Sequence, residues 1–147
     1  MTYLDTSALV KRFLFEPGSA RVRVLTESSR DIAIATVGYA EIYAALNRKR
    51  RDGDLSRAEY NQAAERFEMH WRSYFRVPLH DDILDLARAL TERHPLRGFD
   101  AIHLASALSL RQALDEEIAF AAADHRLLQA AASEGLQPLD VDAAAGT

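Results

Sequence analysis

The stretch Asp31-Ile32-Ala33-Ile34-Ala35 decides the fold, because it is a compact apolar run with helical patterns on both sides. Short apolar runs of this kind are typical of strands that are buried between two layers of helices. The flanking helical patterns cover residues 19–28 and 37–51. This arrangement predicts mainly parallel pairing, since a helix between two strands carries the chain back to the starting edge of the sheet.

Strand and helix patterns alternate along the rest of the chain, without an internal repeat. Strands are predicted at residues 2–4, 31–35, 76–79, 118–121 and 137–141. Helices are predicted at residues 7–15, 19–28, 37–51, 56–73, 81–93, 100–113 and 124–135. The third strand is expected near an edge, because Pro78 has no N–H to donate to a ladder. We therefore expect an α/β fold, a three-layer α/β/α sandwich with a central, mainly parallel sheet of four to five strands.

Length and composition are those of an ordinary globular domain. The chain has 147 residues, of which 48% are hydrophobic and 27% charged, and this excludes a disordered or fibrous protein. We expect residues 1–141 to form one domain and residues 142–147 to form a short C-terminal tail. The formal net charge of −4 disfavours a dedicated duplex-binding protein, which usually has a basic surplus.

The sequence also bears on the compartment of the protein. It contains no cysteine, which excludes disulfides, thiolate metal sites and cysteine nucleophiles. This fits a reducing cytoplasm, where we expect the protein to act. No secretory signal is visible at the N-terminus, and no segment approaches the ~20 apolar residues that span a bilayer. We therefore expect no membrane partner.

Four acidic residues are predicted to meet at one edge of the sheet. Asp5 ends the first strand, and Asp124 follows the fourth. Glu41 lies about one turn into the helix after the second strand, and Asp100 opens the helix before the fourth. The carboxyl ends of parallel strands share an edge with the N-termini of the connecting helices, and ligands of open α/β sheets bind there. The sequence therefore predicts a cluster of four carboxylates.

Three of these acids also have a simple structural explanation. Asp5, Asp100 and Asp124 each stand where a helix begins, and an aspartate there can cap free backbone N–H groups. Glu41 resists this explanation, because its neighbours in the chain are suited to burial and an unpaired buried carboxylate costs several kcal/mol. Glu41 is thus the residue that most favours a functional site.

A cation is expected among these carboxylates, because four negative charges on one edge repel one another. Ligation by oxygen alone favours a hard ion, Mg²⁺ or Mn²⁺. Zinc is disfavoured, since cysteine is absent and the five histidines show no paired spacing on a helix. The six glycines form neither a G-x-G-x-x-G nor a G-x-x-x-x-G-K-[ST] motif, so a phosphate-cradling loop is unsupported.

Four stretches resemble the motifs of PIN-domain nucleases. They are Tyr3-Leu4-Asp5-Thr6-Ser7-Ala8-Leu9, Glu41-Ile42-Tyr43-Ala44-Ala45-Leu46, Asp100-Ala101-Ile102-His103-Leu104-Ala105-Ser106-Ala107, and Ala123-Asp124-His125-Arg126-Leu127-Leu128. The likeness covers nearly the whole chain, and its length and motif order are most similar to VapC-type toxins of bacterial toxin–antitoxin pairs. One position departs from the family: Ala122 stands where members often have a threonine, two residues before the fourth acid.

The resemblance implies a role for each matching residue. Asp5, Glu41, Asp100 and Asp124 would bind one or two divalent ions. Thr6 or Ser7 would orient Asp5 or a ligated water. The resemblance further implies hydrolysis of RNA by water attack, a homodimer, and inhibition by a VapB-like antitoxin. Two alternatives stay open, namely a non-catalytic PIN-like module that binds RNA or protein and a housekeeping RNA-processing nuclease.

Basic residues supply the candidates for RNA contact. One cluster closes the helix predicted at 37–51 and consists of Arg48, Lys49, Arg50 and Arg51. These side chains would anchor phosphates or, alternatively, only complement the helix dipole. Arg97 precedes Asp100 and would either reach a phosphate at the same edge or be solvated. His103, one turn after Asp100, would either hydrogen-bond or coordinate near the metal or be a packed histidine that is bonded to backbone, and we expect the second.

Overall fold

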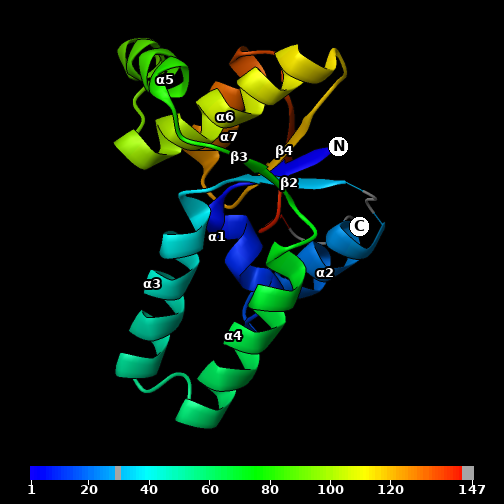
Figure 1. Ribbon diagram of the computed structural model, residues 1–147, viewed down its shortest axis with the longest axis vertical. Helices are drawn as coiled ribbons and strands as arrows, with labels where there is room; N and C mark the ends of the chain where they lie inside the picture. Colours follow the sequence, from blue (N-terminus) through cyan, green and yellow to red (C-terminus); the bar gives the residue numbers. More distant parts are fainter. Residues whose placement is uncertain (29–30, 144–147) are drawn as a thin grey trace.

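The computed structural model describes residues 1–28 and 31–143, and it forms a parallel sheet between two helical layers (Figure 1). The strands are β1 (Thr2–Leu4), β2 (Ile32–Ala35), β3 (Phe75–Val77), β4 (Ala119–Ala122) and β5 (Gln137–Asp140). The helices are α1 (Thr6–Leu9), the 3₁₀ helix η1 (Val10–Arg12), α2 (Ser19–Ser28), α3 (Gly38–Arg51), α4 (Arg57–Trp71), α5 (Asp81–Arg93), α6 (Gly98–Leu114) and α7 (His125–Ser133).

The five strands lie in the order β3-β2-β1-β4-β5, and every neighbouring pair is parallel. The predicted α/β/α sandwich is therefore confirmed, and so is the edge position of the strand before Pro78. The chain moves from β1 to β2 on one side of the sheet and later returns to place β4 on the other side of β1. The boundary between β1 and β4 is thus the topological switch point, where open α/β sheets bind ligands.

Side chains of the central strands alternate between two cores. In β2, Ala33 faces the core under α5, α6 and α7, whereas Ile32 and Ile34 face the core against α1 to α4. The same alternation separates Phe120 from Ala121 in β4. Figure 1 shows the two helical layers on opposite faces of the sheet, with α3 and α4 extending away from it as a hairpin. A sheet that is covered on both faces explains the continuous apolar run in β2.

Some local expectations differ from the structure. The helix predicted at 7–15 is one α-helical turn, α1, continued by the shorter η1. Where the chain turns, the buried Lys11 contacts the Pro17 carbonyl (2.8 Å), Glu16 and Asp142. The capping box at Ser56 and Glu59 is confirmed. Residues 144–147 of the expected tail lie outside the described part. No helix within 1–28 and 31–143 is long and apolar enough to cross a bilayer.

A close approach at Gly38 brings α3 to the edge of the sheet. Gly38 is the first residue of α3, and a Cβ atom built there would lie 2.5 Å from Ile34 Cδ1 and 2.9 Å from Ile34 Cγ1. Ile34 is fully buried in β2, so it has little room to move aside. The absence of a side chain at Gly38 therefore helps to set the position of Glu41 one turn later.

Gly38→Ala is expected to lower the free energy of unfolding by about 1–3 kcal/mol, because the added methyl overpacks the core at Ile34. Gly98→Ala is the matched control, since Gly98 also begins a helix but a Cβ there would meet nothing within 4 Å. The control is expected to be neutral or to stabilise the protein by ~0.4–1 kcal/mol. Urea unfolding of both variants measures the difference, and equal stabilities would contradict this explanation.

Candidate active site

Asp5 is a buried carboxylate at the end of β1. It is 4% exposed and caps α1, accepting hydrogen bonds from Ser7 Oγ (2.7 Å) and the Ala8 N–H (3.0 Å). Its own N–H donates to the Ala121 carbonyl (3.1 Å), which fixes this end of β1 against β4. Burial raises the pKa of Asp5 to about 6, although His103 and the two hydrogen bonds oppose this rise. The fold thus holds a carboxylate where its charge is poorly solvated.

Ser7 connects Asp5 to the segment that carries Asp124. Its hydroxyl contacts both carboxylate oxygens of Asp5 and accepts a hydrogen bond from the Ala123 N–H (3.2 Å). Ala122, where the family often has threonine, is fully buried in the core on the α6–α7 side of the sheet. The residue predicted to support Asp5 therefore also fixes the backbone next to Asp124.

Glu41 lies in the first turn of α3, with 27% of its side chain exposed. Its Oε1 accepts hydrogen bonds from Thr6 Oγ1 (2.8 Å) and from His103 Nε2 (2.7 Å). Burial would raise the pKa of Glu41, but the hydrogen bond and charge of His103, together with Thr6, outweigh it and lower the pKa. Glu41 is thus paired with a histidine and a threonine at the sheet edge.

His103 takes part in the site through side-chain contacts, which is the alternative that the sequence favoured less. It is 2% exposed, and its Nδ1 lies 2.7 Å from the Tyr3 hydroxyl, which also accepts from the Ala35 N–H (3.0 Å). Because a carboxylate only accepts, the hydrogen on Nε2 must point toward Glu41. The expectation of a bond to backbone was therefore wrong: the partners are side chains. The one available signal was the i+3 spacing from Asp100, which places both residues on one face of α6.

Asp100 and Asp124 complete the edge. Asp100 lies inside the first turn of α6 and is not its N-cap, which is Arg97, but it still accepts from the Arg97 backbone N–H, so only the expected cap position was wrong. Asp124 does cap α7, accepting from the Arg126 N–H (2.8 Å) and the Leu127 N–H (3.3 Å), as Asp5 caps α1. A cap uses only part of the accepting capacity of a carboxylate, so capping does not exclude a second role.

The four predicted acids share one electrostatic neighbourhood. Burial raises the pKa of Asp100, and the charge of Asp124 adds to this rise. The charge of Asp100 in turn raises the pKa of Asp5, while His103 acts on Asp5, Glu41 and Asp100. Four segments that are far apart in the sequence thus place their carboxylates around the switch point. Within residues 1–28 and 31–143, however, no set of three or more acidic or histidine side chains is arranged to hold a metal ion.

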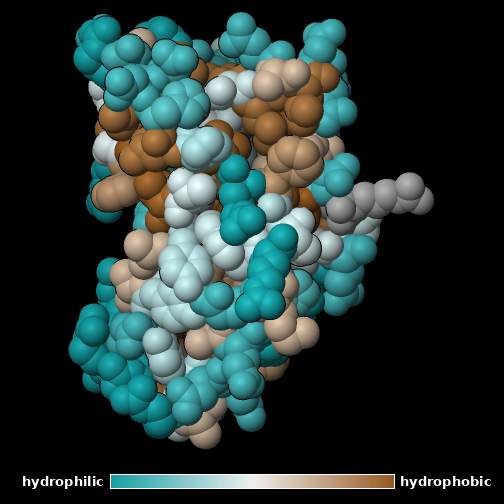
Figure 2. Space-filling view, in the orientation of Figure 1, coloured by the Kyte–Doolittle hydropathy of each residue, from teal (hydrophilic) through white to brown (hydrophobic). Residues whose placement is uncertain are grey.

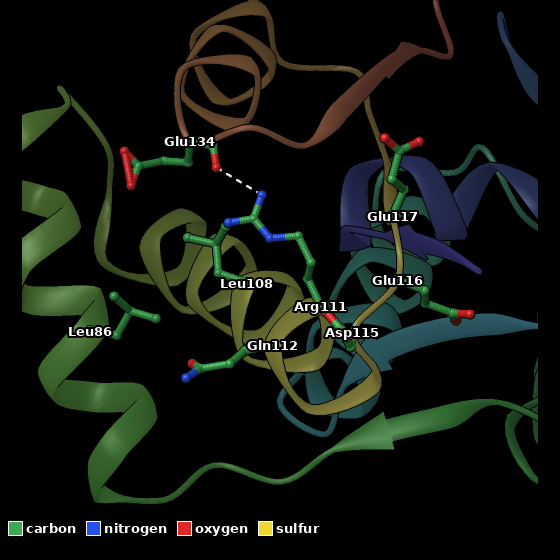
Figure 3. Close-up of a pocket in the computed structure, with 8 residues that line it drawn as sticks. All are labelled: Leu86, Leu108, Arg111, Gln112, Asp115, Glu116, Glu117 and Glu134. Carbon is green, nitrogen blue, oxygen red and sulfur yellow. Dashed lines mark hydrogen bonds between the residues drawn. The ribbon is translucent and has the colours of Figure 1, made fainter.

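A cavity of about 310 Å³ opens beside two of these acids. It is lined by Pro95, Arg97, Asp100, Asp124, His125 and Arg126. A larger hollow of about 640 Å³ lies elsewhere, where Arg111 donates to the Glu134 carbonyl (2.9 Å; Figure 3). That hollow includes residues 115–117, just before β4, and so lies at the amino end of the strand. The smaller cavity is the one at the ligand-binding edge.

The predicted basic residues divide between two places. The cluster at residues 48–51 occupies the last turn of α3, at least ~10 Å along the helix from Glu41. Figure 2 shows hydrophilic side chains covering that far end of the α3–α4 hairpin. Lys49 pairs there with Glu16 (3.7 Å) and Asp54 (3.9 Å). Arg97, by contrast, lines the cavity beside Asp100.

Comparison with known proteins gives a consistent result. A family described as PIN domain matches residues 2–134. Ribonuclease VapC49 of Mycobacterium tuberculosis is 33% identical over 135 residues, which cover 92% of each chain. Ribonuclease VapC47 from the same species is 34% identical over 132 residues, covering 87% of this chain and 88% of the relative.

Solved structures agree on the fold. The structure of FitAcB from Neisseria gonorrhoeae superposes with a TM-score of 0.71 at 16% identity, covering 96% of this chain and 98% of the other. A chain in a toxin–antitoxin complex from Klebsiella pneumoniae gives a TM-score of 0.55 at 20% identity, covering 81% and 84%. At these identities the likeness establishes the architecture.

Asp5→Asn is expected to stabilise the metal-free protein at pH 8 by up to ~3 kcal/mol, because it removes a buried charge. The folded-state pKa of Asp5, about 6, is above its ordinary value of 3.8, so the wild-type protein loses stability as the pH rises between these values. The asparagine variant should lack this loss, and asparagine still caps a helix.

Urea unfolding at pH 4 and pH 8, in the presence of a chelator, measures this effect. Asp124→Asn is the control, because Asp124 caps a helix in the same way but is exposed. The control should show little pH-dependent change. A lower stability of Asp5→Asn than of the wild type at pH 8 would contradict the interpretation of Asp5 as a destabilising buried charge.

Proposed function

Because the chain belongs to the PIN-domain family, as a VapC-type member, we propose that it is a divalent-metal-dependent endoribonuclease that hydrolyses RNA phosphodiester bonds. One observation carries the proposal: at the carboxyl edge of a parallel sheet, the charges of Asp100 and Asp124 act on Asp5 and Asp100, respectively, and His103 joins Glu41 to the same neighbourhood. The relatives are named ribonucleases, and these names support the reaction class.

The donor type of the site, carboxylate oxygen, is the one that a hard divalent cation prefers, although among the described residues no three such side chains are spaced to hold one. The four acids offer carboxylate oxygens, and burial raises the pKa of Asp5 despite the opposing effects of His103, Ser7 and Ala8, so a bound cation would favour its charged form. We propose that Asp5, Glu41, Asp100 and Asp124 hold Mg²⁺ or Mn²⁺. Such an ion, when bound, supplies an activated water and neutralises charge on the scissile phosphate.

The protein's own side chains keep this site in order. Ser7 fixes the orientation of Asp5 through bonds to both of its carboxylate oxygens. Thr6 and His103 hold Glu41 at the same edge, and Tyr3 holds the ring of His103 from the other side. Thr6 and Ser7 thus both support acids, Thr6 at Glu41 and Ser7 at Asp5.

Nucleophilic attack by Thr6 is disfavoured by its hydrogen bonds. The Thr6 hydroxyl donates to Glu41, and the facing His103 Nε2, 3.2 Å from Thr6 Oγ1, carries a hydrogen toward the same carboxylate. A nitrogen that carries a hydrogen cannot accept the Thr6 proton, so His103 does not act as its general base in this arrangement. This arrangement supports attack by water rather than by a side chain.

Purified protein is expected to cleave single-stranded RNA with Mg²⁺ or Mn²⁺ and to lose this activity when a chelator is added. Asp5→Asn and Glu41→Gln should each lower the cleavage rate by more than ~100-fold, since weaker supporting contacts at metal sites already contribute 10–100-fold. Glu92→Gln is the matched control, because Glu92 is an exposed carboxylate on α5.

Gel analysis of labelled RNA measures the cleavage rates, and calorimetry measures Mn²⁺ binding. Cleavage that survives both the chelator and Asp5→Asn would overturn the metal-dependent mechanism. A protein that binds neither Mn²⁺ nor Mg²⁺ and leaves RNA intact would instead favour the non-catalytic binding module.

We further propose that the enzyme is the toxin of a toxin–antitoxin pair, acts in the cytoplasm, forms a homodimer and is inhibited by a VapB-like antitoxin. The similar chain from Klebsiella pneumoniae belongs to a toxin–antitoxin complex, and this supports an antitoxin partner. Apolar side chains over the α5–α6 layer support self-association (Figure 2). Leu84 and Phe99 on these helices are 45% and 56% exposed.

Induced expression in a bacterial host is expected to arrest growth, because RNA cleavage would stop translation. Co-expression of a small gene that neighbours the gene of this protein should restore growth. Expression of the Asp5→Asn variant should not arrest growth at all. Optical density after induction measures the effect. Unimpaired growth with the active enzyme present would favour the housekeeping nuclease.

A further inference from the structure

The cavity of about 310 Å³ at the starts of α6 and α7 combines two acids of the proposed site with three basic side chains. Asp100 and Asp124 form one part of its lining, and Arg97, His125 and Arg126 form another. Neither the fold nor the proposed metal site accounts for this concentration of positive charge. The basic part of the lining therefore has the composition of an anion-binding site beside the acids.

The two guanidinium groups in the cavity are free to bind a ligand. Within the described part of the chain, the side chains of Arg97 and Arg126 form neither a hydrogen bond nor an ion pair, and both residues are exposed. Other arginines nearby are engaged: Arg93 pairs with Glu134 (2.6 Å), and Arg111 donates to the Glu134 carbonyl (2.9 Å).

The neighbouring acids form no close ion pair with these arginines, because they accept from backbone instead. Asp124 is held by the backbone N–H groups of Arg126 and Leu127, and Asp100 by the backbone N–H of Arg97. The charge of Arg97 acts on Asp100 only as a minor influence that lowers its pKa. Each arginine therefore contributes its backbone to an acid while its side chain remains available. His125 is partly engaged, since its Nε2 lies 3.6 Å from Asp140 Oδ2.

We propose that Arg97 and Arg126 bind a backbone phosphate of the RNA next to the scissile phosphodiester, an inference that rests on the proposed function. The guanidinium group is planar and presents paired N–H donors that match phosphate oxygens. A polyanion that approaches four carboxylates is repelled, and cations at the same edge offset that repulsion. Arg97, at the N-cap of α6, and Arg126, in the first turn of α7, line the same cavity, so both face a phosphate that enters it.

This role differs from a general attraction of RNA to basic residues. Arg48 and Arg51 are also exposed and unpaired within the described residues, but they lie at the far end of α3. Among the described residues, the arginines that line a cavity with Asp100 and Asp124 are Arg97 and Arg126. The proposal therefore predicts that position, and not charge alone, determines the contribution of an arginine.

The test measures RNA cleavage and RNA binding in Arg97→Ala, Arg126→Ala and the double variant. Cleavage assays give KM and kcat, and fluorescence anisotropy with a labelled RNA oligonucleotide gives the affinity in the Asp5→Asn background. Each single variant is expected to weaken binding about 10-fold or more, as for loss of a charge-assisted hydrogen bond. It should also reduce the salt slope of binding by about one, and KM should change more than kcat.

The comparison variant is Arg48→Ala/Arg51→Ala, which removes the same charge at the other candidate basic cluster, and the proposal expects it to change KM and the salt slope less than the Arg97→Ala/Arg126→Ala double variant does. Arg126→Lys keeps the charge but loses the paired donors, and it should restore only part of the affinity. Circular dichroism establishes that each variant is folded. Arg97 makes no side-chain cap bond to α6, so its removal spares the helix start.

Unchanged KM and salt slope in the double variant, with wild-type cleavage intact, would overturn the phosphate assignment and leave the proposed nuclease standing. An equal loss of affinity in the Arg48/Arg51 comparison variant would also overturn it, by showing that charge alone matters. Absence of both cleavage and RNA binding in the wild type would instead refute the proposed function itself.

Discussion

The hydrogen bond from His103 to Glu41 joins the two helical layers across the edge of the sheet. His103 belongs to α6 on one face and Glu41 to α3 on the other, and Tyr3 of the central strand supports the histidine from below. The bond links side chains 62 positions apart and is partly buried, with His103 enclosed and Glu41 reaching the surface. The relative placement of all four acids depends on these two layers keeping their register.

The same edge shows a conflict between stability and activity. Asp5 is buried and its pKa is raised, so folding keeps a charge where solvation is poor. Its bonds to Ser7 and Ala8 reduce this penalty without removing it. Residues that are retained at a cost to stability are characteristic of functional sites. Asp5 therefore contributes more to the proposed chemistry than to the fold.

The sequence predicted the layers and the strands, because burial patterns and parallel topology are local and general properties, and it predicted that Asp5, Asp100 and Asp124 lie close enough for their charges to interact. It did not predict the side-chain bonds of His103, since pairing across 100 residues with Tyr3 leaves no periodic signal. The sequence also predicted that this helix begins at Asp100. In the structure α6 begins at Gly98, and its N-cap, Arg97, makes no cap hydrogen bond with its side chain. Such details are decided by tertiary contacts that propensity does not contain.

One helix, α6, carries three parts of the site: Asp100, His103 and, at its cap, Arg97. Their mutual distances are set by a rise of about 1.5 Å per residue along a rigid rod rather than by loop conformation. Lengthening the connection that precedes Arg97 would move the three together and preserve their spacing. Inserting a single residue between Asp100 and His103 would rotate one away from the other by roughly 100°. Evolution is thus free to vary how α6 is reached, but has little freedom within its first two turns.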